Sequence, residues 1–142
     1  MAHYRAVVDT TRQPDDVFAY LADFHHVAEW DPGVARARAL DGEPRLGARY
    51  EVVTLFRGRE MPLTYEVTAF QPPHQFVVRA SNGRVESLDT ITVESTPTGS
   101  RVTYDALLNP LGIWVLLGPL FARAFQKIGD AAHQGLRRAL TT

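Results

Sequence analysis

Cysteine is absent from this chain of 142 residues. Its absence excludes a disulfide framework, a thiol nucleophile and a thiolate metal site, and it fits the cytoplasmic location that we expect. The chain also has almost no net charge, −1 at pH 7, which speaks against nucleic-acid binding because that binding depends on neutralising phosphates. It contains neither a glycine-rich phosphate loop nor a dinucleotide fingerprint, so we expect no cofactor.

A stretch without any charged residue stands near the C-terminus, from Leu107 to Ala122. A membrane-spanning helix needs about 20 apolar residues, and this shorter stretch is interrupted by Asn109, Pro110, Gly112, Gly118 and Pro119, so we expect no stable span. Three interpretations stay open. The stretch packs over a sheet as the entry to a helix, it gates a cavity, or it forms a membrane-touching or dimer surface.

Most of the chain before this stretch shows the alternation of short antiparallel strands joined by tight turns. The strongest turn signal is Asn82-Gly83, which is typical of a hairpin. Two short helical pieces follow the first strand: one begins at Pro14, and the other covers His25–Trp30. The expected strands are His3–Asp9, Val34–Leu40, Ala48–Phe56, Glu60–Phe70, Gln75–Ala80, Arg84–Glu94 and Arg101–Leu108.

The last third of the chain predicts one long amphipathic helix that begins near Pro119. Its polar face is expected to hold Arg123, Lys127, Asp130, Gln134 and Arg137. Its apolar face is expected to hold Phe121, Phe125, Ile128, Ala132, Leu136 and Ala139. This helix needs the strand meander to lie on, so residues 1–142 predict a single α+β domain in which about seven antiparallel strands curve around the helix. Such an arrangement commonly leaves an apolar space between sheet and helix.

Five segments carry a resemblance to a known family: PDDVFAYLADF with EWDPG after it, LGARYEV, YEVTAFQPPHQFVVRA, LDTITVESTPTGSRVTYDA and GPLFARAFQKIGDAAHQGLRRAL. In this order they resemble the START-like (SRPBCC) superfamily, and within it the polyketide cyclase/dehydrase and lipid-transport group. The resemblance implies the helix-grip fold and a deep hydrophobic cavity for lipids, polyketides, plant hormones or other apolar molecules. Some members are enzymes, but the group has no shared catalytic motif, so no active site is carried over.

Strand periodicity predicts which side chains face the cavity. On Arg84–Glu94 the apolar Ile91 and Val93 share a face with Asp89, Ser87 and Val85, which places a carboxylate on the apolar side. The residues expected to contact a ligand are Trp30, Tyr50, Met61, Leu63, Tyr65, Asp89, Ile91, Tyr104, Trp114, Leu117, Phe121 and Phe125.

Asp89 is the most informative polar residue of this set, because burying a carboxylate costs free energy unless it is paired. It orients a ligand or acts as a general base together with Tyr65 or another tyrosine, or else it lies partly solvated near the strand end or pairs with Arg36, Arg38 or Arg79. We favour the second interpretation, since structural ion pairs also perturb carboxylates.

Glu29 lies four residues after His25 and three after His26, so a helix could bring two metal ligands together. Zinc sites in proteins use three or four protein ligands, so we expect no metal site. Two functions remain open. The chain binds an apolar small molecule (polyketide-, lipid- or aromatic-like) as a monomer or homodimer. Alternatively, it is a cyclase, aromatase or dehydratase that uses the same cavity.

Overall fold

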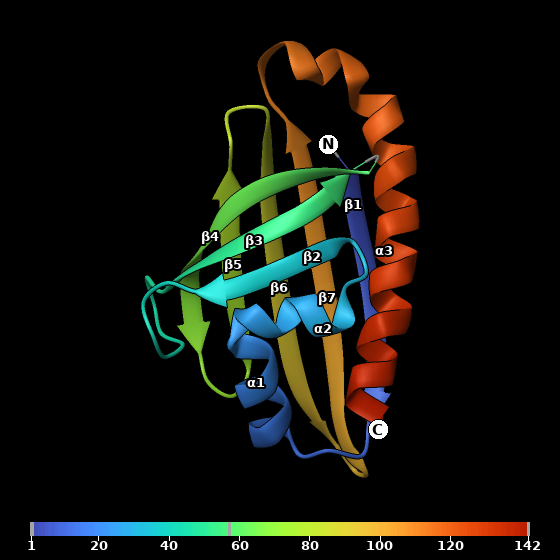
Figure 1. Ribbon diagram of the computed structural model, residues 1–142. Coiled ribbons are helices and arrows are strands. Elements are labelled where there is room, and N and C mark those ends of the chain that lie inside the picture. The colour runs from blue at the N-terminus through green and yellow to red at the C-terminus, as the bar shows by residue number, and fades with distance from the viewer. Residues whose placement is uncertain (1, 57, 142) are drawn as a thin grey trace.

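A computed structural model describes residues 2–56 and 58–141, apart from the side chains of residues 56 and 121. Seven strands form one antiparallel sheet in the order β1-β7-β6-β5-β4-β3-β2. Figure 1 shows this sheet curling from β1 round to β2, β3 and β4, so that it forms a half-barrel. The strands are β1 Ala2–Thr10, β2 Val34–Ala39, β3 Arg49–Phe56, β4 Arg59–Gln71, β5 Gln75–Ser81, β6 Val85–Thr96 and β7 Gly99–Pro110.

Helices occupy two places in this frame. Three short ones, α1 (Pro14–Ala22), η1 (Phe24–His26) and α2 (Val27–Trp30), connect β1 to β2. After β7, the short 3₁₀ helix η2 (Gly112–Leu117) leads into the long helix α3 (Gly118–Thr141), which runs beside β1 (Figure 1). None of the described helices combines the length and the apolar character that crossing a bilayer requires.

Alternating side chains explain why these segments pair as strands and which face they bury. Every second residue of β1 is buried, from Ala2 to Thr10, and β6 buries Val85, Ser87, Asp89, Ile91 and Val93 in the same way. Because successive side chains of a strand point to opposite faces, the apolar positions fix the register of the whole sheet. The predicted inward faces of β4, β6 and β7 are confirmed by these burial patterns.

The C-terminal half of α3 is held tightly against β1. Ala132, Leu136 and Leu140 are buried on the face that was predicted to be apolar. The Tyr4 hydroxyl donates a hydrogen bond to Asp130 at 2.8 Å, and the Thr10 hydroxyl donates to the Leu140 carbonyl at 2.5 Å. These contacts fix the helix at both ends of β1.

Two glycines allow α3 to approach this closely. A Cβ atom added to Gly129 would lie 2.4 Å from the Tyr4 ring, and one added to Gly135 would lie 1.7 Å from the Trp30 carbonyl oxygen. Every other amino acid carries a Cβ atom, which would clash at both positions. Glycine lowers helix stability, so its presence at these buried positions is explained by packing rather than by propensity.

The predicted order of elements is confirmed, with strand ends that shift by one or two residues. The uncharged stretch Leu107–Ala122 divides into the end of β7, helix η2 and the start of α3. The interpretation that all of it packs over the sheet is wrong, because Ile113 and Leu116 are 80% and 84% exposed. Helix η2 turns these side chains away from the sheet.

The close contact at Gly135 can be tested by adding one methyl group. Gly135→Ala should lower the free energy of unfolding by about 3 kcal/mol, because the clash with the Trp30 carbonyl outweighs the roughly 1 kcal/mol by which alanine favours a helix. Gly118→Ala is the matched control, since nothing lies within 4 Å of its added Cβ. Urea denaturation measures both. A Gly135→Ala protein at least as stable as the unmodified chain would contradict this packing.

Candidate functional site

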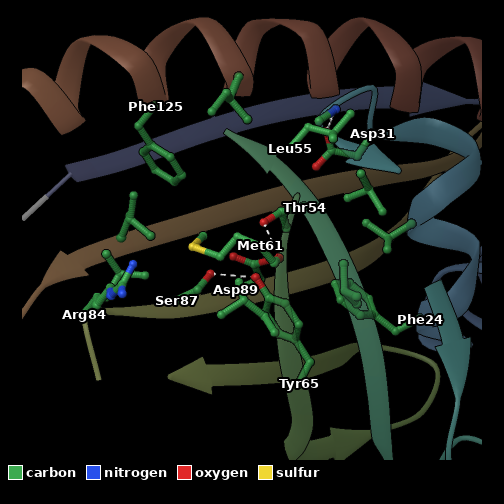
Figure 2. Close-up of a pocket in the computed structure, with 18 of the residues that line it drawn as sticks. Phe24, Asp31, Thr54, Leu55, Met61, Tyr65, Arg84, Ser87, Asp89 and Phe125 are labelled. Carbon is green, nitrogen blue, oxygen red and sulfur yellow. Dashed lines mark hydrogen bonds between the residues drawn. The ribbon is translucent and has the colours of Figure 1, made fainter. Parts of the chain in front are cut away.

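A cavity of about 320 Å³ lies between the curved sheet and the first half of α3. Its size falls in the lower part of the range of small-molecule sites in proteins. In Figure 2, Phe125 points from α3 into the cavity, opposite Met61 and Asp89 on the sheet. The apolar wall consists of Phe24, Val27, Val34, Val52, Leu55, Met61, Leu63, Val85, Leu108, Trp114, Phe125 and Ile128.

A small polar patch interrupts this apolar wall. It comprises Asp31, from the turn after α2, together with Tyr65, Ser87, Asp89 and Tyr104 from three strands of the sheet. The Tyr65 hydroxyl donates a hydrogen bond to Ser87 Oγ at 2.9 Å, and the Tyr104 hydroxyl donates a longer one to Asp89 Oδ2 at 3.4 Å. A few convergent polar groups in an apolar cavity are typical of a site that orients a ligand.

Asp89 is strongly perturbed by its surroundings. Only 5% of its surface is exposed, and it sits in the middle of β6 between Val78 of β5 and Ala106 of β7. Burial, and after it the negative charge of Asp31, raise the pKa of its carboxyl to about 7, although the hydrogen bond from Tyr104 opposes both effects. Asp89 therefore changes its charge near neutral pH.

Asp31 is the second carboxyl group of the cavity. Burial raises its pKa to about 6, while the Gly33 backbone N–H, which donates to Asp31 Oδ1 at 2.8 Å, lowers it. Asp31 remains partly accessible, because it borders the cavity. Burial, and after it the negative charge of Asp89, raise the pKa values of Tyr65 and Tyr104, so both phenols stay protonated.

One end of the cavity opens beside η2. The exposed Arg84 follows the Asn82-Gly83 turn, and its guanidinium lies over the Trp114 ring, 5.6 Å from the ring centre. This is the geometry of a cation–π contact. Both residues belong to the cavity wall, so they border the opening between η2 and the β5–β6 hairpin.

Seven of the predicted ligand residues meet in this cavity: Met61, Leu63, Tyr65, Asp89, Tyr104, Trp114 and Phe125. Four others lie outside its wall. Trp30 is buried with its ring edge-on to Tyr104 at 5.5 Å, Tyr50 packs against Phe24, Ile91 is core, and Leu117 is partly exposed on η2. Phe121 belongs to α3, but its side chain lies outside the described residues.

The favoured interpretation of Asp89 as partly solvated or paired with an arginine is wrong. Arg36 pairs with Glu60, Arg38 with Glu51, and Arg79 with Glu86. All three arginines point to the outer face of the sheet, whereas Asp89 points to the inner face, so the strand pleat keeps them apart. The ion pairs found among the described residues do not include Asp89.

Sequence reasoning missed Asp31 and Arg84. Asp31 had a usable signal, because an aspartate before Pro32-Gly33 is placed to accept a hydrogen bond from the backbone two residues later, and it does so. That signal predicts a turn, however, and does not say that the turn closes one end of a cavity. Arg84 looked like an ordinary charged residue after a hairpin turn.

The histidine pair was expected not to form a metal site. Asp23, and not Glu29, brings a carboxylate oxygen close to His25 and His26, with the three ligand atoms within 4.8 Å of one another. Glu29 accepts a hydrogen bond from the Tyr20 hydroxyl, while His25 Nδ1 contacts Asp23 and His26 Nδ1 contacts the Tyr20 carbonyl, each at 2.7 Å. These contacts supply a structural role for each group, and the expectation of no metal site stays a prediction.

Comparison with known proteins agrees with the fold. The architecture is the START-like helix-grip fold. The chain belongs to the family described as polyketide cyclase / dehydrase and lipid transport, whose model matches residues 1–141. No protein of curated function matches the sequence.

Three solved structures illustrate the likeness. A START superfamily protein from Mycobacterium smegmatis superposes with a TM-score of 0.78 at 12% identity, over 99% of this chain and 97% of that one. Two di-domain ARO/CYC proteins each match 99% of this chain with 50% of their own. StfQ, from the steffimycin pathway, has a TM-score of 0.71 at 14% identity. BexL, from the BE-7585A pathway, has a TM-score of 0.72 at 15% identity. At such low identities the likeness shows the fold alone.

The raised pKa of Asp89 predicts a pH-dependent stability. The folded state holds the Asp89 proton at pH values where the unfolded chain has lost it, so this carboxyl lowers stability as the pH rises from about 4 to about 7. Asp89→Asn removes this effect, which amounts to at most about 4 kcal/mol for a shift of about three pKa units. The stability of the variant relative to the unmodified chain should therefore rise between pH 5 and pH 8 in thermal melts. A stability difference that is equal at both pH values would refute the perturbed carboxyl.

Proposed function

We propose that this protein binds an apolar small molecule of polyketide-, lipid- or aromatic-like character in the cavity between the sheet and α3. The observation that carries the proposal is the cavity itself. Protein interiors are normally packed as densely as organic crystals, with few voids larger than a water molecule, so a cavity of this size calls for an explanation. An unfilled space of about 320 Å³ is more than twice the roughly 150 Å³ of an engineered apolar cavity that takes up benzene. Family membership supports the same function.

The polar patch would orient the ligand inside this cavity. Burial of most of an apolar ligand supplies affinity in proportion to the area removed from water, whereas the patch around Asp89 and Ser87 supplies direction. We expect the protein to act in the cytoplasm as a monomer or homodimer, without a cofactor and without nucleic acid.

A second candidate function is a cyclase, aromatase or dehydratase. Asp89 favours it, because a carboxyl with a pKa of about 7 both accepts and donates protons near neutral pH. The Tyr104 hydroxyl beside it at 3.4 Å would hold the carboxylate in place, and the cavity would fold a flexible chain by confinement.

Filling the cavity tests the binding function. Leu63→Trp places a larger side chain at the inner wall and should weaken binding of an environment-sensitive naphthalene dye at least tenfold, because the indole occupies the ligand space. Thr64→Trp adds the same group to the exposed face of the same strand and should leave the affinity unchanged. Fluorescence titration measures both. Equal affinities in the two variants, with both proteins folded by circular dichroism, would argue against the cavity as the binding place.

Incubation with a linear poly-β-ketone thioester tests the enzymatic candidate. The unmodified protein should speed formation of the cyclised, dehydrated product, and Asp89→Asn should slow it by about 10²-fold or more, the usual contribution of a positioned acid or base. Liquid chromatography with mass detection follows the loss of water. A rate that Asp89→Asn leaves unchanged would exclude this carboxyl as the proton-transfer group.

A further inference from the structure

Most hydroxyl donors inside the cavity are engaged within the protein, and among the described residues the Ser87 hydroxyl, which accepts a hydrogen bond from Tyr65, is the one that keeps its hydrogen. The Tyr65 hydroxyl hydrogen goes to Ser87 Oγ, and the Tyr104 hydroxyl hydrogen goes to Asp89 Oδ2. A hydroxyl group has only one hydrogen to donate. Both phenols that face the cavity are therefore committed to protein oxygens and have none left for a ligand.

Hydrogen-bond acceptors, in contrast, remain available. One oxygen of Asp31 accepts from the Gly33 backbone, and one oxygen of Asp89 accepts from Tyr104. Within the described part of the chain, the second oxygen of each carboxyl group makes no hydrogen bond. Figure 2 shows Asp31 near the turn after α2 and Asp89 on the sheet, at different places on the wall of the same cavity.

Positive charge is also missing next to these carboxyl groups. The ion pairs of residues 2–56 and 58–141 lie elsewhere, and none includes Asp31 or Asp89. Of the side chains that the structure describes on helix α3, those in the wall are the apolar Phe125 and Ile128. Arg84 is the cationic member of the wall, but its guanidinium lies over Trp114 at the opening.

We propose that the cavity selects apolar molecules that carry a protonated amine, with the ammonium group received by the free oxygens of Asp31 and Asp89. The inference rests on the proposed binding function and adds the class of ligand. An ammonium group supplies the positive charge that these two carboxyl groups lack as a partner, together with hydrogen-bond donors for their free oxygens. A ligand whose polar atoms are all carbonyl oxygens would instead meet acceptors and negative charge, except where a carboxyl group is protonated.

Acidification provides an internal check of this inference. The other titratable or charged groups of the cavity wall are Tyr65 from β4, Tyr104 from β7 and, at the opening, Arg84 from the β5–β6 turn, and burial keeps both phenols neutral. The pair itself takes up protons as the pH falls through about 7 and about 6. An amine should therefore lose affinity on going from pH 8 to pH 5, whereas a ketone should gain it.

Three ligands that differ in one group test the proposal: 1-naphthylmethylamine, 1-naphthylmethanol and 1-methylnaphthalene. Calorimetric titration at pH 8 should show the amine binding at least tenfold more tightly than either neutral compound, although it is the most water-soluble of the three. Asp31→Asn and Asp89→Asn should each reduce this preference by threefold or more. Glu94→Gln, which removes an exposed carboxylate from the outer face of β6, should leave it unchanged.

The outcomes separate the two proposals. If 1-methylnaphthalene binds as tightly as the amine, or more tightly, the ammonium preference is overturned and the apolar binding function stands. If none of the three binds, both are overturned. A preference that persists in both aspartate variants, each confirmed as folded by its thermal melt, would also overturn the assignment to Asp31 and Asp89.

Discussion

Close contact between the second half of α3 and β1 is the constraint on which the rest of the structure depends. Gly129 and Gly135 bring the helix backbone against the Tyr4 ring and the Trp30 carbonyl, and Leu136 and Leu140 fill the space between them. A long helix bends only gently, whereas the sheet curls strongly. Contact at one end of α3 therefore leaves a gap at the other, and Phe125 and Ile128 line that gap without filling it.

The strand pleat then decides which polar groups enter the gap. Ile91 and Val93 must face the core, and because side chains alternate, Asp89 and Ser87 face inward with them. A shift of one residue would expose the whole apolar set, so the fold cannot remove Asp89 from the interior by changing register. Burial instead raises the pKa of this carboxyl to about 7, so that it takes up a proton near neutral pH, and the Tyr104 hydroxyl donates a hydrogen bond to it.

The features that could be predicted from the sequence are those that depend on the periodicity of the side chains. Alternation in the strands and the polar stripe of α3 predicted the order of elements, the inward faces and seven residues of the cavity wall, because each depends on local spacing. The position of Asp31 opposite β6 depends on how a turn after α2 meets a distant strand, and no local pattern encodes that distance. The expected arginine partners of Asp89 were wrong for a related reason: the pleat places Arg36, Arg38 and Arg79 on the other face of the sheet, where each pairs with a glutamate.

Binding and catalysis make different demands on the same two carboxyl groups. Below about pH 7, burial and the negative charge of Asp31 favour a protonated Asp89, which is a state suited to proton transfer. A bound cation reverses this balance by stabilising both ionised forms, and it thereby removes the acid that a cyclase would need. The charge of the natural ligand therefore decides between the two functions: a cationic ligand makes the pair a binding site, and a neutral one leaves it able to exchange protons.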